Sequence, residues 1–168
     1  MGERSFTTTE KIMSRKSTDY LIIHCTATKP LMDIGYEEIN RWHKERGWLS
    51  CGYHFIIKRN GVIEDGRTTD SVGAHCRGKN HNSIGIAMVG GVTQEDHTIP
   101  EDNFQGAQWE SLKKLVEELH KQYPNAEVKG HNHFSDKFCP SFDVDDWAKI
   151  ELDWVEGDYL PNDERDPE

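Results

Sequence analysis

The sequence has no long hydrophobic run and no excess of basic charge. No stretch of its 168 residues approaches the length of a membrane-spanning helix, and the first 20 residues lack the continuous apolar segment of a signal peptide. We therefore expect a protein that is made in a cytoplasm and makes no membrane contact. Lys and Arg number 20 against 30 Asp and Glu, which argues against a basic surface for direct nucleic-acid binding.

Cysteine is also scarce. The four residues are Cys25, Cys51, Cys76 and Cys139. A reducing compartment argues against disulfides, so free thiols are expected. Cys139 differs from the others because it lies in the segment "HNHFSDKFCPSFD", close to two histidines. A cysteine in such a setting is a candidate metal ligand or nucleophile.

Charge and hydrophobicity divide the chain into one domain with two polar ends. Hydrophobic residues make up 35% and charged residues 30%, as in soluble globular proteins. Residues 1–17 are polar and are expected to form a mobile extension. From residue 143 to the end there are 11 acidic and 2 basic residues. We expect residues 157–168 to be a disordered acidic tail and 18–156 to be the folded domain.

The hydrophobic pattern alternates strands with helices. Buried strands are predicted over residues 19–25, 83–91 and 126–131, and helices over 35–47, 106–124 and 143–155. Residues 53–67 read as a hairpin with Asn60-Gly61 as a two-residue type I′ turn. These elements predict an α/β fold with a mixed central β-sheet flanked by helices.

Two of the predicted strands end in histidine, at His24 and His131. Strand ends are places where a rigid sheet presents side chains to a cleft. Either histidine alone is better read as a satisfied core residue. Together with Cys139 they suggest three protein ligands and one open position, the pattern of catalytic zinc. His133 is the nearest rival ligand, and we expect it to face solvent instead.

Several motifs in the same order resemble one known family. The segments "HCTATKP", "GWLSCGYHFIIKRNG", "VGAHCRGKNHNSIGIAMVGG" and "CPSFD" are similar to those of the T7-type phage lysozymes. These are zinc N-acetylmuramoyl-L-alanine amidases related to the peptidoglycan recognition proteins. The resemblance covers roughly residues 18–155. It implies a zinc cleft at one end of the sheet, with His24, His131 and Cys139 holding one Zn²⁺ per chain.

The resemblance also implies a function and catalytic residues. The chain would be an endolysin that hydrolyses the amide between N-acetylmuramic acid and L-alanine of peptidoglycan. It would be made in the host cytoplasm and reach the periplasmic cell wall after holin-type release. Lys137 matches the family's catalytic lysine and could stabilise the tetrahedral oxyanion. Tyr53 matches its catalytic tyrosine and could hydrogen-bond the attacking water or relay its proton. The sequence does not identify the general base.

Residues 73–85 are rich in glycine but lack a phosphate-loop signature. We read them as a wall of the substrate cleft, with His75 and Asn80 as contacts to the sugar or peptide. A purely structural loop is nearly as good a reading. His54 should point to the strand face opposite Tyr53. Of the other histidines, His43 is expected in the core, whereas solvated positions are expected for His81, His97 and His120.

Three other functions remain open. The first is a module that binds peptidoglycan without cutting it, which the presence of Cys139 disfavours. The second is inhibition of a phage RNA polymerase, a role that T7-type lysozymes also have. The third is a zinc peptidase, for which the H-E-x-x-H helix is missing. We expect a monomer, but the sequence does not reveal oligomeric state, host or stem-peptide preference.

Overall fold

A five-stranded mixed sheet forms the centre of the molecule, in a computed structural model that describes residues 12–155. The strand order is β3-β2-β4-β1-β5. Only β2 and β3 pair antiparallel, and the other pairs are parallel, which confirms the predicted mixed sheet. The strands are β1 (Tyr20–Cys25), β2 (Phe55–Ile57), β3 (Ile63–Asp65), β4 (Ser83–Met88) and β5 (Glu127–Gly130).

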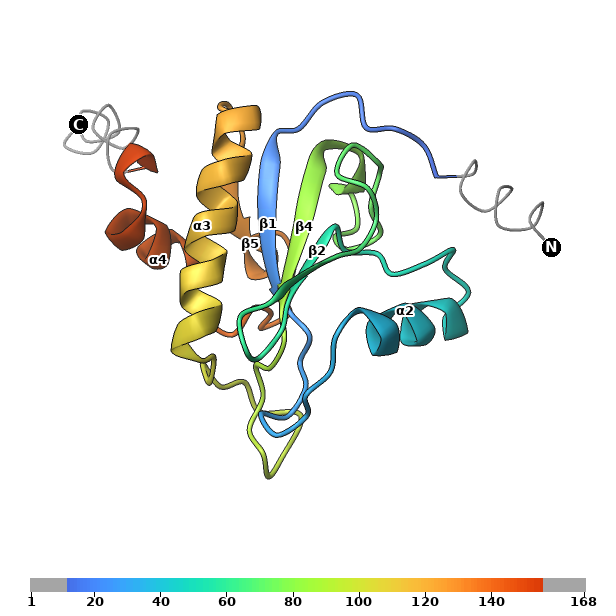
Figure 1. The fold of residues 1–168 in the computed structure, drawn as a ribbon, viewed down its shortest axis with the longest axis vertical. Helices are drawn as coiled ribbons and strands as arrows, with labels where there is room; N and C mark the ends of the chain where they lie inside the picture. The colour runs from blue at the N-terminus through green and yellow to red at the C-terminus, as the bar shows by residue number, and fades with distance from the viewer. Residues whose placement is uncertain (1–11, 156–168) are drawn as a thin grey trace.

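Within the described residues, three α-helices flank this sheet. They are α2 (Tyr36–Glu45), α3 (Gly106–Gln122) and α4 (Val144–Glu151), and two short 3₁₀ helices are η1 (Asn80–Asn82) and η2 (His131–His133). In Figure 1, α3 and α4 lie to the left of the sheet and α2 to its right. Each predicted helix is present. Gly47, with φ +93°, follows the C-cap residue Arg46 of α2, as the sequence predicts for a helix stop.

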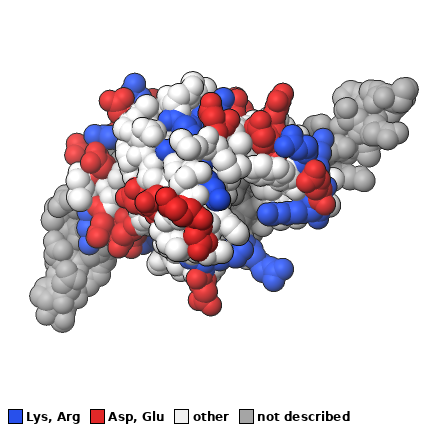
Figure 2. Space-filling view, turned by 90° about the horizontal axis from the view of Figure 1, so that it is seen from below, with Lys and Arg blue, Asp and Glu red and all other residues white. Residues whose placement is uncertain are grey.

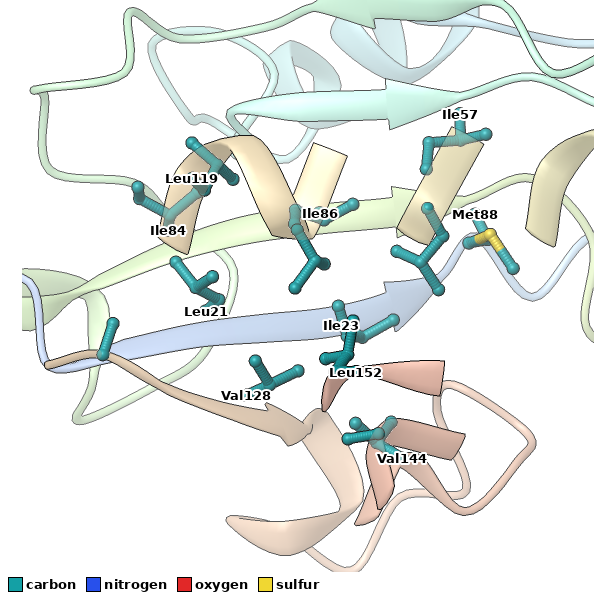
Figure 3. Packing of buried hydrophobic residues seen from close by; sticks show 14 of the residues in the cluster. Leu21, Ile23, Ile57, Ile84, Ile86, Met88, Leu119, Val128, Val144 and Leu152 are labelled. Atoms are coloured by element: carbon teal, nitrogen blue, oxygen red, sulfur yellow. The ribbon is translucent and has the colours of Figure 1, made fainter. Parts of the chain in front are cut away.

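The two faces of β1 serve different purposes because side chains alternate along a strand. Leu21 and Ile23 point into a core shared with β4, α3 and α4, where Ile86 and Leu152 are also fully or almost fully buried (Figure 3). His24 lies on the opposite face, toward α2. His24 is therefore built into an interior strand of the sheet, paired with β4 on one side and β5 on the other.

Gln108 joins α3 to the sheet. Its side chain is fully buried, and Nε2 donates to the carbonyl oxygens of Ile57 (3.2 Å) and Val89 (3.0 Å). Its Oε1 accepts from the backbone N–H of Gln105 (2.9 Å) and from Nη1 of Arg59 (3.2 Å). One amide thus satisfies two carbonyls where β2 and β4 end and one N–H where α3 begins.

The β2–β3 hairpin is present, but the predicted type I′ turn is wrong. That turn requires positive φ at both central residues, and Asn60 does not have it whereas Gly61 does (φ +89°). The backbone N–H of Lys58 donates to Val62 (2.9 Å), and that of Gly61 donates back to Lys58 (2.8 Å). This is the pattern of a three-residue loop, which sequence alone does not separate from a two-residue Asn-Gly turn.

The predicted mobile extension over residues 1–17 is wrong for its last residues. Ser14 forms an antiparallel bridge with Ser71, and the Val72 N–H donates to the Met13 carbonyl (2.8 Å). Arg15 Nη1 donates to the carbonyl oxygens of Thr69 (2.7 Å) and Ser71 (2.8 Å). These polar residues are held by hydrogen bonds to backbone groups. Such contacts need no hydrophobic side chains, so the hydrophobic pattern of the sequence does not reveal them. Residues 1–11 and the predicted tail, 157–168, lie outside the described residues.

Other details depart from the sequence reading by small amounts. β1 runs one residue past His24, and β5 ends at Gly130, so His131 opens η2. His120 is only partly exposed and stacks on Trp154 with ring centroids 3.7 Å apart, so the prediction of a solvated side chain is wrong. His43 is buried, as predicted.

The described surface carries charge of both signs. On the face in Figure 2, acidic side chains adjoin basic ones. Among residues 12–155, no helix is long and apolar enough to cross a bilayer.

His54 should make the fold sensitive to acid. It is fully buried, donates from Nε2 to the Ser71 carbonyl (2.8 Å) and accepts at Nδ1 from the Gly85 N–H (3.0 Å). Burial lowers the pKa of His54 to about 4, against about 6.5 in an unfolded chain. The unfolded state then binds more protons below pH 6.5, so stability is full above that pH and falls as the pH drops toward 4.

By pH 5 this residue should have cost about 2 kcal/mol of unfolding free energy. We expect His54→Gln to lose less stability than the unmodified protein between pH 7 and pH 5, measured by urea unfolding. Because other histidines titrate as well, the difference between the two proteins is the informative quantity. Parallel losses in both would contradict the assignment.

Candidate active site and metal centre

Three potential metal ligands meet beside the carboxyl end of the sheet. His24 comes from β1, His131 from the first residue after β5, and Cys139 from the loop before α4. One ligand atom from each lies within 4.8 Å of the others. His24 Nδ1 is 3.8 Å from the Cys139 sulfur, and the two histidine ring centroids are 4.6 Å apart. Two donors bound tetrahedrally to one zinc ion would stand about 3.6 Å apart, so this set can share an ion.

The protonation states also suit a cation. Burial, together with neighbouring histidines, holds the pKa of His24 well below its usual range, and burial lowers that of His131. Both imidazoles are therefore neutral and have a lone pair to give at neutral pH. Burial raises the pKa of the Cys139 thiol in the absence of a metal. The Cys25 backbone N–H already donates to this sulfur (3.1 Å), and a bound cation would make it a thiolate.

His133 does not belong to this group. Its side chain is exposed, whereas the three candidate ligands are buried or partly buried. The structure thus places His133 where the sequence reading expected it, in solvent. The donor set has two nitrogens, one sulfur and no carboxylate. Such a set suits zinc far better than magnesium or calcium, which prefer oxygen ligands.

A cleft of about 760 Å³ opens beside the donors. His131 lines it together with Lys137, His75 and Asn80, so four of the predicted site residues share one cavity. Its remaining walls come from the α2–β2 loop, the loop before η1 and the segment after η2. They are Trp48, Ala74, Cys76, Arg77, Gly78, Phe134 and Ser135.

Lys137 reaches this cleft from an exposed loop. Its side chain is exposed, and its charge is close enough to lower the pKa values of His24, His131 and Cys139. In each case burial is the larger influence. A cation in this place is available to a charge that develops on a bound substrate.

Tyr53 lies next to the donors on the α2 side of the sheet. Its ring centroid is 5.1 Å from that of His24 and 5.5 Å from that of His43. Burial, reinforced by nearby thiols, raises the pKa of Tyr53. The phenol therefore stays protonated at neutral pH and can act as a hydrogen-bond donor.

The two residues expected to contact substrate have protein partners. His75 is 9% exposed, and its Nδ1 is 2.8 Å from Nε2 of His24. Its Nε2 is 3.2 Å from Ser83 Oγ, so a hydrogen bond to substrate does not fit its present contacts. Asn80 Oδ1 accepts from the backbone N–H groups of His75 and Cys76 (2.8 and 2.9 Å). The amide nitrogen of Asn80 is the part still suited to a substrate, and that role stays a prediction.

Sequence reasoning missed three contributors to the site. The sequence predicts an ordinary free thiol at Cys25, but the Cys25 backbone N–H donates to the Cys139 sulfur. The sequence places Ser83 in a buried strand and predicts no contact for it, but its hydroxyl contacts His75. Gly85 leaves room for the His75 ring, because a Cβ there would lie 2.5 Å from His75 Cγ. The glycine within an otherwise apolar strand was the available signal, since such a glycine often marks a close approach.

The chain is similar to known amidases and endolysins. The model of the N-acetylmuramoyl-L-alanine amidase family matches residues 14–142. An endolysin of Escherichia phage T7 is 48% identical over 133 residues, which cover 79% of this chain and 87% of that protein. An endolysin of Klebsiella phage KP32 is 47% identical over the same shares of the two chains.

Solved structures share the fold. The endolysin amidase LysCS from Clostridium intestinale superposes with a TM-score of 0.72 at 27% identity, covering 84% of this chain and 87% of that one. The peptidoglycan recognition protein PGRP-SA of bumblebee gives a TM-score of 0.70 with the same coverage; at 22% identity it shows likeness of fold alone. Because the family model spans most of the described residues, the chain belongs to the N-acetylmuramoyl-L-alanine amidase family.

Proposed function

We propose that this amidase is a zinc-dependent endolysin that cuts the amide between N-acetylmuramic acid and L-alanine in peptidoglycan. The observation that carries the zinc dependence is the convergence of His24, His131 and Cys139 on one point beside a cleft. When bound, zinc supplies a Lewis acid that polarises the substrate carbonyl and lowers the pKa of water to about 7. The Cys139 sulfur would then be a ligand rather than the attacking group.

The protein's own residues would orient the substrate and stabilise charge. Lys137 lines the cleft and would stabilise the oxyanion that forms as the carbonyl becomes tetrahedral. Tyr53, whose phenol is protonated at neutral pH, would donate a hydrogen bond beside His24. The cleft, with the Asn80 amide group on its wall, would hold the sugar–peptide junction.

Metal content tests this assignment directly. The purified protein should carry about one zinc per chain, measured by atomic absorption. His131→Ala should lose most of this zinc, because it removes one of three protein ligands. His133→Ala is the matched control, two residues away and exposed, and it should keep its zinc. Loss of zinc from His133→Ala but not from His131→Ala would show that His133, rather than His131, is the ligand.

Lysis separates an enzyme from a module that only binds peptidoglycan. The protein should clear permeabilised Gram-negative cells in a turbidity assay, and a chelator should stop the clearing. Added zinc should restore it. Clearing that persists with zero bound zinc would exclude the zinc mechanism, and zinc-loaded protein that binds walls without cutting them would favour the binding module.

Inhibition of a phage RNA polymerase remains a separate prediction, based on the resemblance to T7-type lysozymes. No surface or contact among the described residues supports inhibition of a polymerase. A transcription assay with purified polymerase of the cognate phage would test this inhibition. Release to the periplasm is a separate prediction, and lysis of the same host with and without a holin would test it.

A further inference from the structure

A chain of hydrogen bonds runs from a candidate metal ligand into the protein interior. His24 Nε2 is 2.8 Å from His75 Nδ1, and His75 Nε2 is 3.2 Å from Ser83 Oγ. Ser83 Oγ is 2.6 Å from the carbonyl oxygen of Lys79. His24 and Ser83 are almost completely buried, and His75 is 9% exposed. The chain therefore ends on a backbone group that can only accept a hydrogen bond.

That final carbonyl fixes the direction of every bond before it. Ser83 must donate its only hydrogen to Lys79, which leaves its lone pairs for His75. The proton of neutral His75 is then on Nε2, and its Nδ1 accepts. Since that Nδ1 accepts from His24, the proton of His24 is on Nε2. The free lone pair of His24 is on Nδ1, the atom 3.8 Å from the Cys139 sulfur.

Two glycines hold the His75 ring in the position that this chain needs. A Cβ at Gly85 would lie 2.5 Å from His75 Cγ, and a Cβ at Gly73 would lie 2.7 Å from Cδ2. Contacts this short do not occur, so any other residue would displace the ring. The backbone N–H groups of His75 and Cys76 are bound by Asn80, which fixes the loop itself.

We propose that His75 is a positioning residue that keeps His24 in the tautomer whose Nδ1 lone pair faces His131 and Cys139. The inference rests on the proposed zinc site. A histidine ligand is usually oriented by a carboxylate, a backbone carbonyl or water at its other nitrogen. Here a second histidine has that task. The opposite tautomer would turn an N–H toward the other ligands and would have to move its proton before metal could bind.

Zinc affinity of paired variants tests the role of His75. His75→Leu fills the slot without an acceptor and should lower zinc affinity about 10–100-fold, measured by competition with a chromophoric chelator. His75→Asn carries an oxygen on Cγ, where Nδ1 was attached, and should stay within a few-fold of the unmodified protein. Ser83→Ala removes the hydroxyl that fixes the tautomer of His75 but keeps His75 itself, so an intermediate loss of zinc affinity is expected. Equal losses in the Leu and Asn variants would overturn the proposal.

His54→Asn is the matched control. His54 is even more buried than His75 and its ring centroid is 5.8 Å away, but its hydrogen bonds go to Ser71 and Gly85 rather than to His24. Its replacement should lower the melting temperature and leave zinc affinity unchanged. If His54→Asn lost as much zinc affinity as His75→Leu, the loss in His75→Leu would be explained by general destabilisation of the protein.

Nitrogen-15 NMR of the histidine rings provides a readout independent of activity. His24 should carry its proton on Nε2 in the unmodified protein and in His75→Asn. A proton on Nδ1 of His24 would overturn the proposal, whether or not zinc is bound. Failure of the unmodified protein to bind zinc would instead contradict the proposed function, so the two ideas fail by different results.

Discussion

Replacing Lys137 with alanine is expected to slow amide hydrolysis about a hundred- to a thousandfold, the usual loss when one oxyanion donor is removed. The side chain is exposed and is not one of the three metal donors, so zinc content and melting temperature should stay unchanged. The affected parameter should be kcat. The charge that Lys137 opposes develops only as the carbonyl becomes tetrahedral, so substrate binding should weaken much less.

Two further variants sharpen this prediction. Lys137→Arg keeps the charge but changes the donor geometry, and partial activity is expected. Lys114→Ala removes an exposed lysine from α3, away from the cleft lining, and should leave turnover unchanged. Turnover should be measured on soluble muropeptides with zinc-loaded protein. Near-normal turnover of Lys137→Ala would remove Lys137 from the mechanism.

Replacing Gln108 with alanine is expected to lower the unfolding free energy by roughly 3–5 kcal/mol. The change would remove the hydrogen bonds of Gln108 to the Ile57 and Val89 carbonyls and to the Gln105 N–H, each worth about 0.5–1.5 kcal/mol. Only the Gln105 N–H would lose its partner, because the two carbonyls still accept from the Val89 N–H and from Arg59 Nη1. The positive charge of Arg59 would also lose a contact. Urea denaturation at neutral pH measures the effect.

Controls on the same helix isolate the hydrogen bonds of Gln108. Gln122→Ala, at the exposed end of α3, should change stability by less than about 0.5 kcal/mol. Gln108→Glu keeps the shape but replaces a donor with an acceptor facing the carbonyls of Ile57 and Val89. It should be at least as destabilising as alanine. A cost below about 1 kcal/mol for Gln108→Ala would show that water replaces the amide.

The order of strands and helices was predictable because hydrophobic periodicity records which residues face the core. The runs around Ile23 and Ile86 are buried on both faces of the sheet, and α3 shows its stripe at helical spacing. The type of turn at Gly61 was not predictable, because Asn-Gly suits more than one loop length. The pairing of Arg15 with residues 69–71 was hidden as well, since polar backbone contacts leave no periodic trace.

The candidate site was predictable in its residue types but not in all of its roles. His24, His131 and Cys139 stood out as metal-binding types at strand ends and in a loop, and the structure brings them together. His75 has the same chemistry as a ligand or a substrate contact. Its contacts are decided by His24, 51 positions away, and by Ser83, eight positions away. The contact with His24 is long-range and cannot be read from local spacing.

The wide spacing of the three donors also governs when the site can exist. His24 and Cys139 are separated by 115 positions, and β1 receives its neighbours β4 and β5 only from later parts of the chain. Long-range parallel pairing forms slowly, because the entropy of closing a large loop is lost before the stabilising contacts between the strands form. In a growing chain on the ribosome, the candidate metal site therefore cannot assemble until Cys139 has emerged. Synthesis itself delays catalytic competence, and a chain interrupted before that residue lacks one of the three donors.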